Sequence, residues 1–403
     1  MSKYTLGDLL ELKRGQDLTK DDMHEGFYPV VGSNGIIGTH DSFNVGAPCI
    51  TVGRSGTIGN VHYYNKDCWA HNTCLYISDF KNNNPLYLYY LLKNIDLTKV
   101  ATSTGVPTLN RNFVYPITTI ATTNVDEQNN IANVLSALDD KIANNNAISN
   151  QLESLMKTIY DYWFLQFEFP NEEGKPYKSS GGKMAWNEEL KREIPKGWSS
   201  GTLSDYGNII GGGTPSTTNE TYYTEPYKGI AWITPYDLAN TTDKYIEHGA
   251  RDITKEGLQK SSAVLMPAGS VLMTSRAPIG YLAISQNEIC TNQGFKSIVP
   301  NKKYGKEFVY HSLSALMPYI KSQGVGSTFS EISGTTLKNL PCLCPDIIIS
   351  NKFEKLVEKF AIKQSICESE NRELISLRDF LLPLLMNGQV TFRDDKETVP
   401  LEK

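Results

Sequence analysis

The chain has 403 residues, of which 40% are hydrophobic, and it carries a formal net charge of −5. At roughly 150 residues per domain this length predicts two or three domains, each with a buried core, which excludes disordered and fibrous classes. Apolar runs such as Leu86–Leu92 are far shorter than the roughly 18 residues of a membrane span, so we expect a soluble chain with no membrane partner. The start of the chain shows no secretory or transit pattern. The seven scattered cysteines favour thiols in the cytoplasm over a disulfide framework.

The net charge hides an uneven distribution of charged residues. Residues 1–125 hold 10 basic and 10 acidic side chains, and residues 198–349 hold 12 of each. The acidic excess therefore lies in the connecting segments. Neither of the two large segments is prevented by its charge from approaching a polyanion such as DNA.

An internal repeat runs through the chain. Tyr4–Asp8 resembles Gly201–Asp205, and Val52–Gly59 resembles Thr274–Gly280, which places Arg54 opposite Arg276. At an offset of 220, further matches join Asn72 to Asn292, Tyr90 to Tyr310, and Thr108-Leu109 to Thr328-Phe329. Because the order of the matches is kept, we expect two copies of one α/β fold with different loops.

Each copy is followed by a heptad pattern. From Ile131 and again from Phe353, residues recur at alternating steps of four and three, which is typical of a coiled coil. A helix of about 40 residues is roughly 60 Å long, whereas a domain of about 120 residues has a radius of gyration of only about 13–14 Å. We therefore expect the two helices to pair as an antiparallel coiled coil with pseudo-twofold symmetry. The alternative is that each helix packs along its own domain.

Both heptad seams become polar midway. If the helices pair, these polar residues would fix their register. They are Asn145, Ser149, Gln364 and Asn371.

The resulting fold class is α+β, with two diverged α/β domains. The expected segments are a first domain (1–125), a central spacer helix (126–167), an exposed linker (168–197), a second domain (198–349), a C-terminal spacer helix (350–388) and a polar tail (389–403).

Motifs for chemistry are missing. The glycine-rich segments lack the lysine of a phosphate-binding loop, and no set of carboxylates has the spacing of a Mg²⁺ nuclease site. Asn84–Tyr87 comes nearest to the tetrapeptide of an amino-methyltransferase, but its third residue is leucine. Cys68-x-x-His71-x-x-Cys74 has the residue types of a zinc site, although its spacing favours a buried strand. We therefore expect no catalytic residue, metal or cofactor in this chain.

Several strings give the chain a resemblance to a known family. The strongest matches are Tyr162–Tyr177, Ile194–Trp198, Gly326–Ile332 and Leu381–Gly388. Over about residues 1–388 the chain resembles the specificity subunit of type I restriction–modification systems. One departure is Gly105–Asn110, where the first repeat lacks the fuller Gly-Ser-Thr-Phe pattern of the second.

The resemblance implies that each repeat is a target recognition domain. Each would read one half of a bipartite, asymmetric site in double-stranded DNA, and the helices would separate the halves. The same helices would carry two methylation subunits, which use S-adenosylmethionine to methylate adenine at N6, and restriction subunits, which use ATP and Mg²⁺. The chain itself would be non-catalytic.

Reading base edges needs suitable donors and acceptors, such as Arg for guanine and Asn or Gln for adenine. The candidate DNA-binding residues are Arg54, Asn72, Arg276, Asn292, Gln293 and Lys296. Two other functions stay open at this point: a self-contained DNA modification enzyme component, and a tandem-repeat scaffold that binds only protein.

Overall fold

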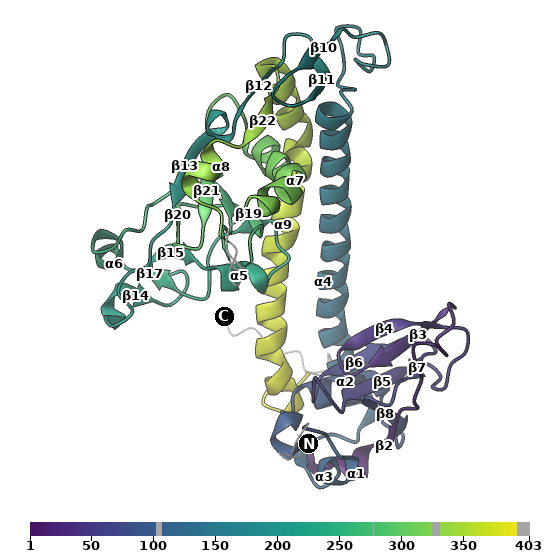
Figure 1. Cartoon of the computed structure of the whole chain (residues 1–403). Helices are drawn as coiled ribbons and strands as arrows, with labels where there is room; N and C mark the ends of the chain where they lie inside the picture. The colour runs from purple at the N-terminus through teal and green to yellow at the C-terminus, as the bar shows by residue number, and fades with distance from the viewer. Residues whose placement is uncertain (102–106, 277, 325–330, 393–403) are drawn as a thin grey trace, which may run out of the picture. The chain divides into compact units, whose positions relative to one another are not determined.

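The computed structural model describes residues 1–101, 107–276, 278–324 and 331–392. The matches expected at Gly105–Asn110 and Gly326–Ile332 fall partly or mainly outside these ranges. The chain forms two compact units: the first contains residues 1–144 and 371–403, and the second contains residues 145–370. Each unit holds one α/β domain and part of each of two long helices, α4 (Val125–Tyr160) and α9 (Ile347–Met386) (Figure 1).

The first unit contains a four-stranded sheet, β2-β8-β5-β6, a three-stranded sheet, β4-β3-β7, and the pair β1-β9. Its strands are β1 (Ser2–Thr5), β2 (Glu11–Arg14), β3 (Tyr28–Gly32), β4 (Gly35–His40), β5 (Cys49–Gly53), β6 (Val61–Tyr64), β7 (Trp69–Ala70), β8 (Cys74–Asp79) and β9 (Thr118–Ala121). Its shorter helices are α1 (Leu6–Leu9), α2 (Pro85–Lys93), η1 (Leu97–Val100) and α3 (Arg111–Val114).

The start of α2 explains the Asn-Pro-Leu-Tyr string. The Asn84 side chain accepts hydrogen bonds from the backbone N–H groups of Leu86 and Tyr87, at 2.8 and 3.0 Å, and Pro85 occupies the first helical turn. These residues form a standard helix N-terminus. The string is therefore a helix cap.

The second unit contains a five-stranded sheet, β13-β21-β18-β19-β16, a four-stranded sheet, β14-β17-β15-β20, and the pairs β12-β22 and β10-β11. Its strands are β10 (Met184–Asn187), β11 (Arg192–Pro195), β12 (Ser199–Thr202), β13 (Gly207–Gly211), β14 (Tyr223–Thr224), β15 (Ile230–Ile233), β16 (Tyr245–Ile246), β17 (Asp252–Ile253), β18 (Val271–Met273), β19 (Leu282–Ser285), β20 (Ile289–Thr291), β21 (Lys296–Pro300) and β22 (Pro341–Cys344). Its helices besides α4 and α9 are η2 (Asp161–Leu165), η3 (Leu203–Asp205), η4 (Glu220–Tyr222), α5 (Pro235–Ala239), α6 (Lys255–Gln259), α7 (Lys306–Ser322) and α8 (Gly334–Lys338).

The five-stranded sheet of the second unit is apolar on both faces. Val271 and Met273 of β18 join one core with α7 and the long helices, whereas Leu272 between them joins a second core with the four-stranded sheet. Successive side chains of a strand point to opposite faces, so a continuous apolar run serves both cores. This is why β18 shows no alternation of polar and apolar residues.

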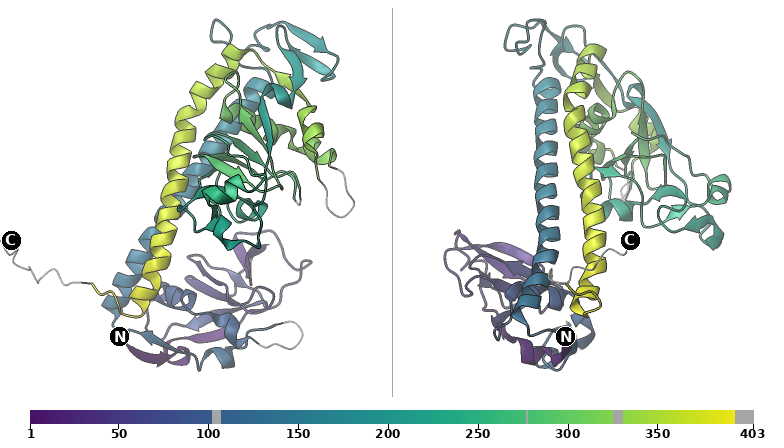
Figure 2. Two further views of the ribbon diagram at one scale, coloured as in Figure 1. Left: turned by 90° about the vertical axis from the view of Figure 1, so that its left-hand side faces the viewer. Right: turned by 180° about the vertical axis from the view of Figure 1, so that it is seen from behind.

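The two long helices run antiparallel within each unit (Figure 2). In the first unit, Ile131 near the start of α4 shares a core with Leu385 near the end of α9. In the second unit, Met156 near the end of α4 shares a core with Phe353 and Val357 near the start of α9. The predicted pairing of the helices is confirmed.

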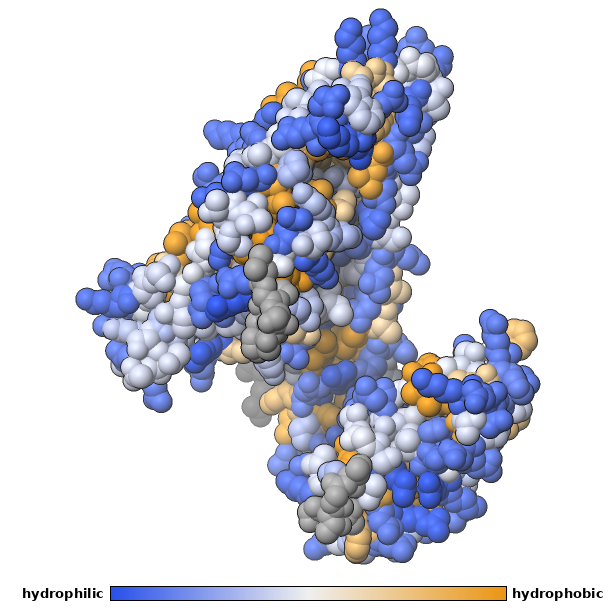
Figure 3. Space-filling view, in the orientation of Figure 1, coloured by the Kyte–Doolittle hydropathy of each residue, from blue (hydrophilic) through white to orange (hydrophobic). Residues whose placement is uncertain are grey.

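Hydrophilic residues dominate the visible surface of both units, with small apolar patches between them (Figure 3). Among the described residues, no helix combines the length and the hydropathy needed to cross a membrane.

Candidate nucleic-acid interface

The loop after β5 is fastened to two other segments of the first unit. The Arg54 backbone N–H donates to the carbonyl of Thr73 at 2.9 Å, and the Arg54 carbonyl accepts from the N–H of Leu109 at 2.8 Å. Three segments that are distant in sequence therefore meet at Arg54.

The second unit repeats this arrangement after β18, and the repeat reveals the true correspondence. The Ser275 N–H donates to the Gly294 carbonyl at 2.7 Å, and the Ser275 carbonyl accepts from the N–H of Ile332 at 2.9 Å. By backbone hydrogen bonding, Arg54 therefore corresponds to Ser275. The expected match of Arg54 with Arg276 is wrong by one residue.

Two isolated bridges give the same result. Ser55 pairs with Thr108 in the first unit, and Arg276 pairs with Glu331 in the second. Arg276 therefore corresponds to Ser55. Matching by residue type aligned the two arginines, but neighbouring residues of an extended segment point to opposite sides, so these side chains occupy different environments.

The position shared by Arg54 and Ser275 connects two loops. Nη1 of Arg54 donates to the Asn72 carbonyl at 3.4 Å, and the buried Ser275 hydroxyl donates to the Gly294 carbonyl at 3.2 Å. Burial, followed by the nearby charge of Arg14, lowers the pKa of Arg54. Both side chains bond to a backbone carbonyl of equivalent loops, which lie between β7 and β8 in the first domain and between β20 and β21 in the second.

The amides of Asn72 and Gln293 correspond to each other. Nδ2 of Asn72 donates to Oδ1 of Asp17 at 2.6 Å, and Oε1 of Gln293 accepts from the hydroxyl of Thr214. The residue numbers of Asp17 and Thr214 differ by 197, the offset that relates the starts of the two repeats. Those of Asn72 and Gln293 differ by 221, the offset that also relates Arg54 to Ser275. The expected match of Asn72 with Asn292 is therefore also wrong by one residue.

Asn292 corresponds to His71. The N–H of His71 donates to the Val31 carbonyl, the N–H of Asn292 donates to the Ile233 carbonyl, and both distances are 2.9 Å. Oδ1 of Asn292 also accepts from the N–H of Gly294 at 2.8 Å, which shapes the turn. This side chain is occupied in holding its own loop.

Lys296 and Arg14 occupy corresponding cross-strand pairs. Arg14 of β2 lies opposite Leu75 of β8, and Gly211 of β13 lies opposite Lys296 of β21. Each domain therefore carries one cation at this pair, although on opposite strands. A residue-by-residue match of the two sequences does not reveal this equivalence.

A buried charged cluster in the second unit was missed by sequence reasoning. Lys244, whose side chain is 3% exposed, lies 2.8 Å from a carboxylate oxygen of Glu153 on α4 and 2.8 Å from one of Glu307 on α7. Burial lowers the pKa of Lys244, but the two carboxylates outweigh this effect and raise it, so the ammonium stays charged. Burial, followed by the charge of Lys244, lowers the pKa of neighbouring His311 to about 2 and keeps that ring neutral.

This cluster also reaches α9. Oε2 of Glu368 accepts from the backbone N–H of Tyr245 at 2.9 Å, and Gln364 donates to the other oxygen at 3.0 Å. Burial is the main cause that raises the pKa of Glu368 to about 7. The second domain is thus attached to both long helices by directional polar contacts.

The first unit has a smaller joint of the same kind. The hydroxyl of Tyr90 on α2 donates to Asp139 of α4 at 2.7 Å, and Nη1 of Arg378 on α9 donates to the same carboxylate at 2.8 Å. Tyr90 corresponds to His311 rather than to Tyr310, because the helix N-caps are Asn84 and Gly305. Nδ1 of His311 lies 3.8 Å from Glu153 of α4, so each domain contacts α4 from one equivalent position.

The polar residues of the heptad seams are buried between the helices. Asn145 donates to Glu370 at 2.8 Å within the second unit, and Asn371 donates to the Ile142 carbonyl at 3.4 Å within the first. Ser149 and Gln364 are also buried. Asn145 and Asn371 are suited to resist sliding of the helices, since a shift would separate these buried amides from their partners on the other helix.

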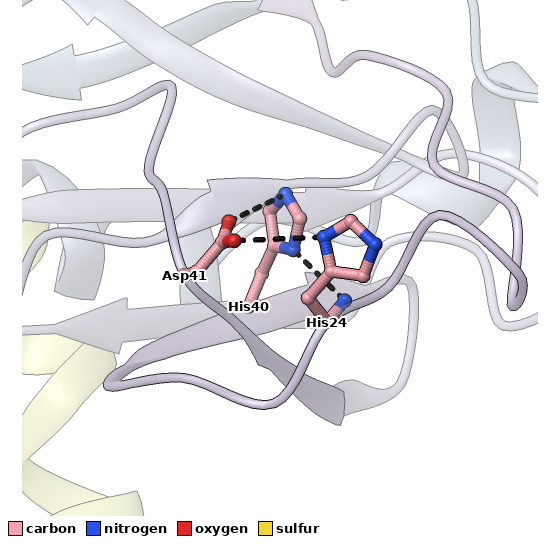
Figure 4. Close-up of side chains that lie close together, drawn as sticks. All are labelled: His24, His40 and Asp41. Atoms are coloured by element: carbon pink, nitrogen blue, oxygen red, sulfur yellow. Dashed lines mark hydrogen bonds and ion pairs between the residues drawn. The ribbon is translucent and has the colours of Figure 1, made fainter.

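A group of possible metal ligands lies in the first unit (Figure 4). One nitrogen of His24 and one of His40 each lie 3.5 Å from an oxygen of Asp41. However, Nδ1 of His40 accepts the backbone N–H of His24 at 3.3 Å. A metal on Nε2 would require a proton on Nδ1, which would then face another donor. We therefore assign no metal to this group.

The cysteines near His71 are core residues. Cys68 and Cys74 are fully buried together with Cys49. The Cys74 thiol donates to the backbone carbonyls of Val31 and His71, and burial raises its pKa to about 12. A thiol that stays protonated is a poor zinc ligand.

Known proteins match this chain in sequence and in fold. A model of the type I restriction modification DNA specificity domain matches residues 1–154 and 195–368. The MjaIX specificity subunit of Methanocaldococcus jannaschii is 35% identical over 53% of this chain and 50% of its own length, and the HindI specificity subunit of Haemophilus influenzae is 25% identical over 66% and 67%. The S subunit from M. genitalium is 20% identical, covers 96% of both chains and has a TM-score of 0.62, which shows a shared fold.

The family match, together with the repeated domain and the paired helices, defines the class of protein as a DNA specificity subunit. The chain belongs to the type I restriction modification DNA specificity domain family. The predicted family is confirmed, and with it the expectation of a non-catalytic chain, so a self-contained modification enzyme is no longer a candidate. The chain spans only half the length of the MjaIX subunit.

Proposed function

We propose that this chain reads a bipartite, asymmetric site in double-stranded DNA, residues 1–125 reading one half and residues 198–349 the other. The observation that carries the proposal is the pair of corresponding loops. They share their backbone hydrogen bonds yet differ in side chains, with Asn72 in place of Gln293 and Ser55 in place of Arg276. The same scaffold with different side chains suits the reading of two different half-sites.

The long helices are suited to act as the spacer between the half-sites. α9 has 40 residues and is therefore roughly 60 Å long at 1.5 Å per residue. Two readers on one face of DNA need a separation of about one helical turn, roughly 34–36 Å. A helix pair of this length can support both domains.

The same helices would carry the partner subunits. Ile362 and Ile366 of α9 are each 54% exposed and stand four residues apart on one helical face within the second unit. Exposed apolar side chains in such an arrangement favour a protein interface. We assign this surface to two methylation subunits, which would bring S-adenosylmethionine. Restriction subunits, which would bring ATP and Mg²⁺, complete the complex. Its work on DNA would take place in the cytoplasm.

The test is an exchange of domains within the co-expressed methylation complex. Residues 1–125 are replaced by the first domain of another specificity subunit, and the methylated adenines of the host DNA are mapped by sequencing. We expect only one half of the methylated site to change, and the reciprocal exchange of residues 198–349 should change only the other half. A change in both halves, or in neither, would contradict the proposal.

A gel-shift assay separates DNA reading from the remaining alternative, a scaffold that binds only protein. The chain is tested alone and with its methylation subunits on DNA that carries the mapped site. Retention of that DNA over a scrambled competitor supports the proposal, whereas protein association without DNA binding supports the scaffold.

A further inference from the structure

The corrected match between the domains identifies one position at which both carry an amide side chain. Asn72 lies between β7 and β8, and Gln293 lies at the same place between β20 and β21. Each is bonded to the segment that follows an equivalent strand, at Asp17 after β2 or at Thr214 after β13. On the basis of the proposed function, we propose that Asn72 and Gln293 are the equivalent base-reading residues of the two domains and that each reads an adenine in its half-site.

The partner of Asn72 fixes the orientation of its amide. An ionised carboxylate can only accept hydrogen bonds, so Asp17 must face the NH₂ group, as the 2.6 Å contact has it. One N–H of Asn72 is used there. The carbonyl oxygen and the second N–H lie together on the other edge of the amide.

That edge matches adenine and no other base in the major groove. Adenine presents a donor at N6 beside an acceptor at N7, whereas guanine presents two acceptors, and cytosine presents only a donor. An amide offers one acceptor beside one donor, so it bonds twice to adenine but sets its oxygen against an acceptor of guanine. Asp17 is then a positioning residue: its oxygen holds the Asn72 amide and also lies 3.8 Å from Nε2 of His71 in the same loop.

Gln293 can present the same edge with a different partner. Its carbonyl oxygen accepts from the Thr214 hydroxyl, and a carbonyl oxygen has a second lone pair for another donor. Both N–H groups of Gln293 are then available for adenine N7. Gln293 is exposed and Asn72 is partly exposed, so both amide groups can reach a ligand.

Both loops are held in place by the backbone. The Cys74 N–H donates to the His71 carbonyl at 3.0 Å, and the Phe295 N–H donates to the Asn292 carbonyl at 3.3 Å. With these turns fixed on both sides of the amides, little ordering is needed when DNA binds, which favours direct reading of a base.

The experiment removes a single acceptor atom from the DNA. The complex of the full chain with its methylation subunits is titrated with duplexes that carry its mapped site, in which each adenine is replaced in turn by 7-deazaadenine. We expect one adenine in each half-site to be sensitive, with affinity falling roughly 5- to 150-fold. Asn72→Ala should lose a similar factor and no longer respond at the sensitive adenine of the first half, while its response in the second half is unchanged. Gln293→Ala should behave in the reverse way.

Matched controls, Asn65→Ala and Asn208→Ala, use exposed asparagines away from the two loops. Asn65 follows β6 at the Cys49 end of β5, whereas Asn72 lies beyond the Gly53 end, and Asn208 lies at the end of the β13–β21 pair that is far from Gln293. Both should keep the full response of the unchanged chain. Asp17→Ala should reduce the discrimination at the adenine assigned to Asn72 without changing the dependence of affinity on salt, which a lost phosphate contact would change.

The outcomes are distinct. If the unchanged complex prefers its site but responds to no 7-deazaadenine, or if Asn72→Ala and Gln293→Ala weaken binding to all DNA alike, the assignment of adenine is wrong and the proposed function stands. If the unchanged complex shows no sequence preference, the proposed function fails and the assignment fails with it. The response to 7-deazaadenine is measured on the unchanged complex, so a variant that does not fold cannot hide this result.

Discussion

Lys244 should contribute strongly to the stability of the second unit. Replacing it with Met keeps the unbranched chain as far as its fourth atom but removes the charge from between Glu153 and Glu307, each 2.8 Å away. The Glu307 side chain is only 1% exposed, so its carboxylate would be left buried without a counter-charge, whereas Glu153 is 30% exposed and can be hydrated. Breaking a buried pair in this way costs about 3–5 kcal/mol of unfolding free energy.

The expected loss is large enough to measure in the full chain. For a unit of 150–250 residues each kcal/mol lowers Tm by roughly 2–4 °C, so Lys244→Met should lower the Tm of the second unit by roughly 6–20 °C. Urea unfolding can be followed by tryptophan fluorescence, because four of the five tryptophans belong to this unit: Trp163, Trp186, Trp198 and Trp232.

Two further variants show whether the lost charge is the cause. Lys244→Met combined with Glu307→Gln removes both charges and should recover part of the loss. Lys228→Met removes the cation of an exposed ion pair with Glu225 and should change stability by at most about 1 kcal/mol. The reasoning is refuted if Lys244→Met costs less than about 1 kcal/mol, or if the double variant is no more stable than the single one.

Three further predictions concern the contacts of the long helices. Burial raises the pKa of Glu368 from 4.5 to about 7, so folding favours the protonated acid and the unfolding free energy should fall as pH rises from about 4.5 to about 7. Glu368→Gln should flatten that dependence in urea titrations at several pH values, and an unchanged slope would contradict it. Tyr90→Phe removes a donor to a carboxylate on α4 and should cost about 1.5–3 kcal/mol by calorimetry; a loss below about 0.5 kcal/mol would show that this hydrogen bond is not needed. Replacing both Asn145 and Asn371 with Leu should raise Tm while the mapped methylation sites accept a wider range of spacer lengths. Lower stability with unchanged spacing would argue against their role in register.

Sequence alone was sufficient for the architecture, because the signals for it are periodic. The heptad steps from Ile131 and Phe353 extend over many residues, so single polar positions do not hide them. The internal repeat kept its order over the whole chain, which predicted two domains of one fold. The pairing of α4 with α9 follows from a pattern of this length, whereas the confirmed family was predicted from short strings such as Tyr162–Tyr177.

The correspondence between single residues in the two loops was decided only by the tertiary structure. The arginines at 54 and 276 and the asparagines at 72 and 292 match by residue type, yet the backbone hydrogen bonds set the register one residue away. A hydrogen bond joins backbone groups whatever the side chain is, so residue identity carries no information about this register.

The buried cluster around Lys244 was also beyond the reach of sequence. Its charged members, Glu153, Lys244, Glu307 and Glu368, come from four segments that are separated by about 60 to 90 residues along the chain. No local pattern distinguishes them from solvated surface charges, which they resemble in sequence. Sequence determined which elements form and which helices pair, because those depend on local periodicity. Only the folded chain determined which polar groups meet, because that depends on how the elements pack.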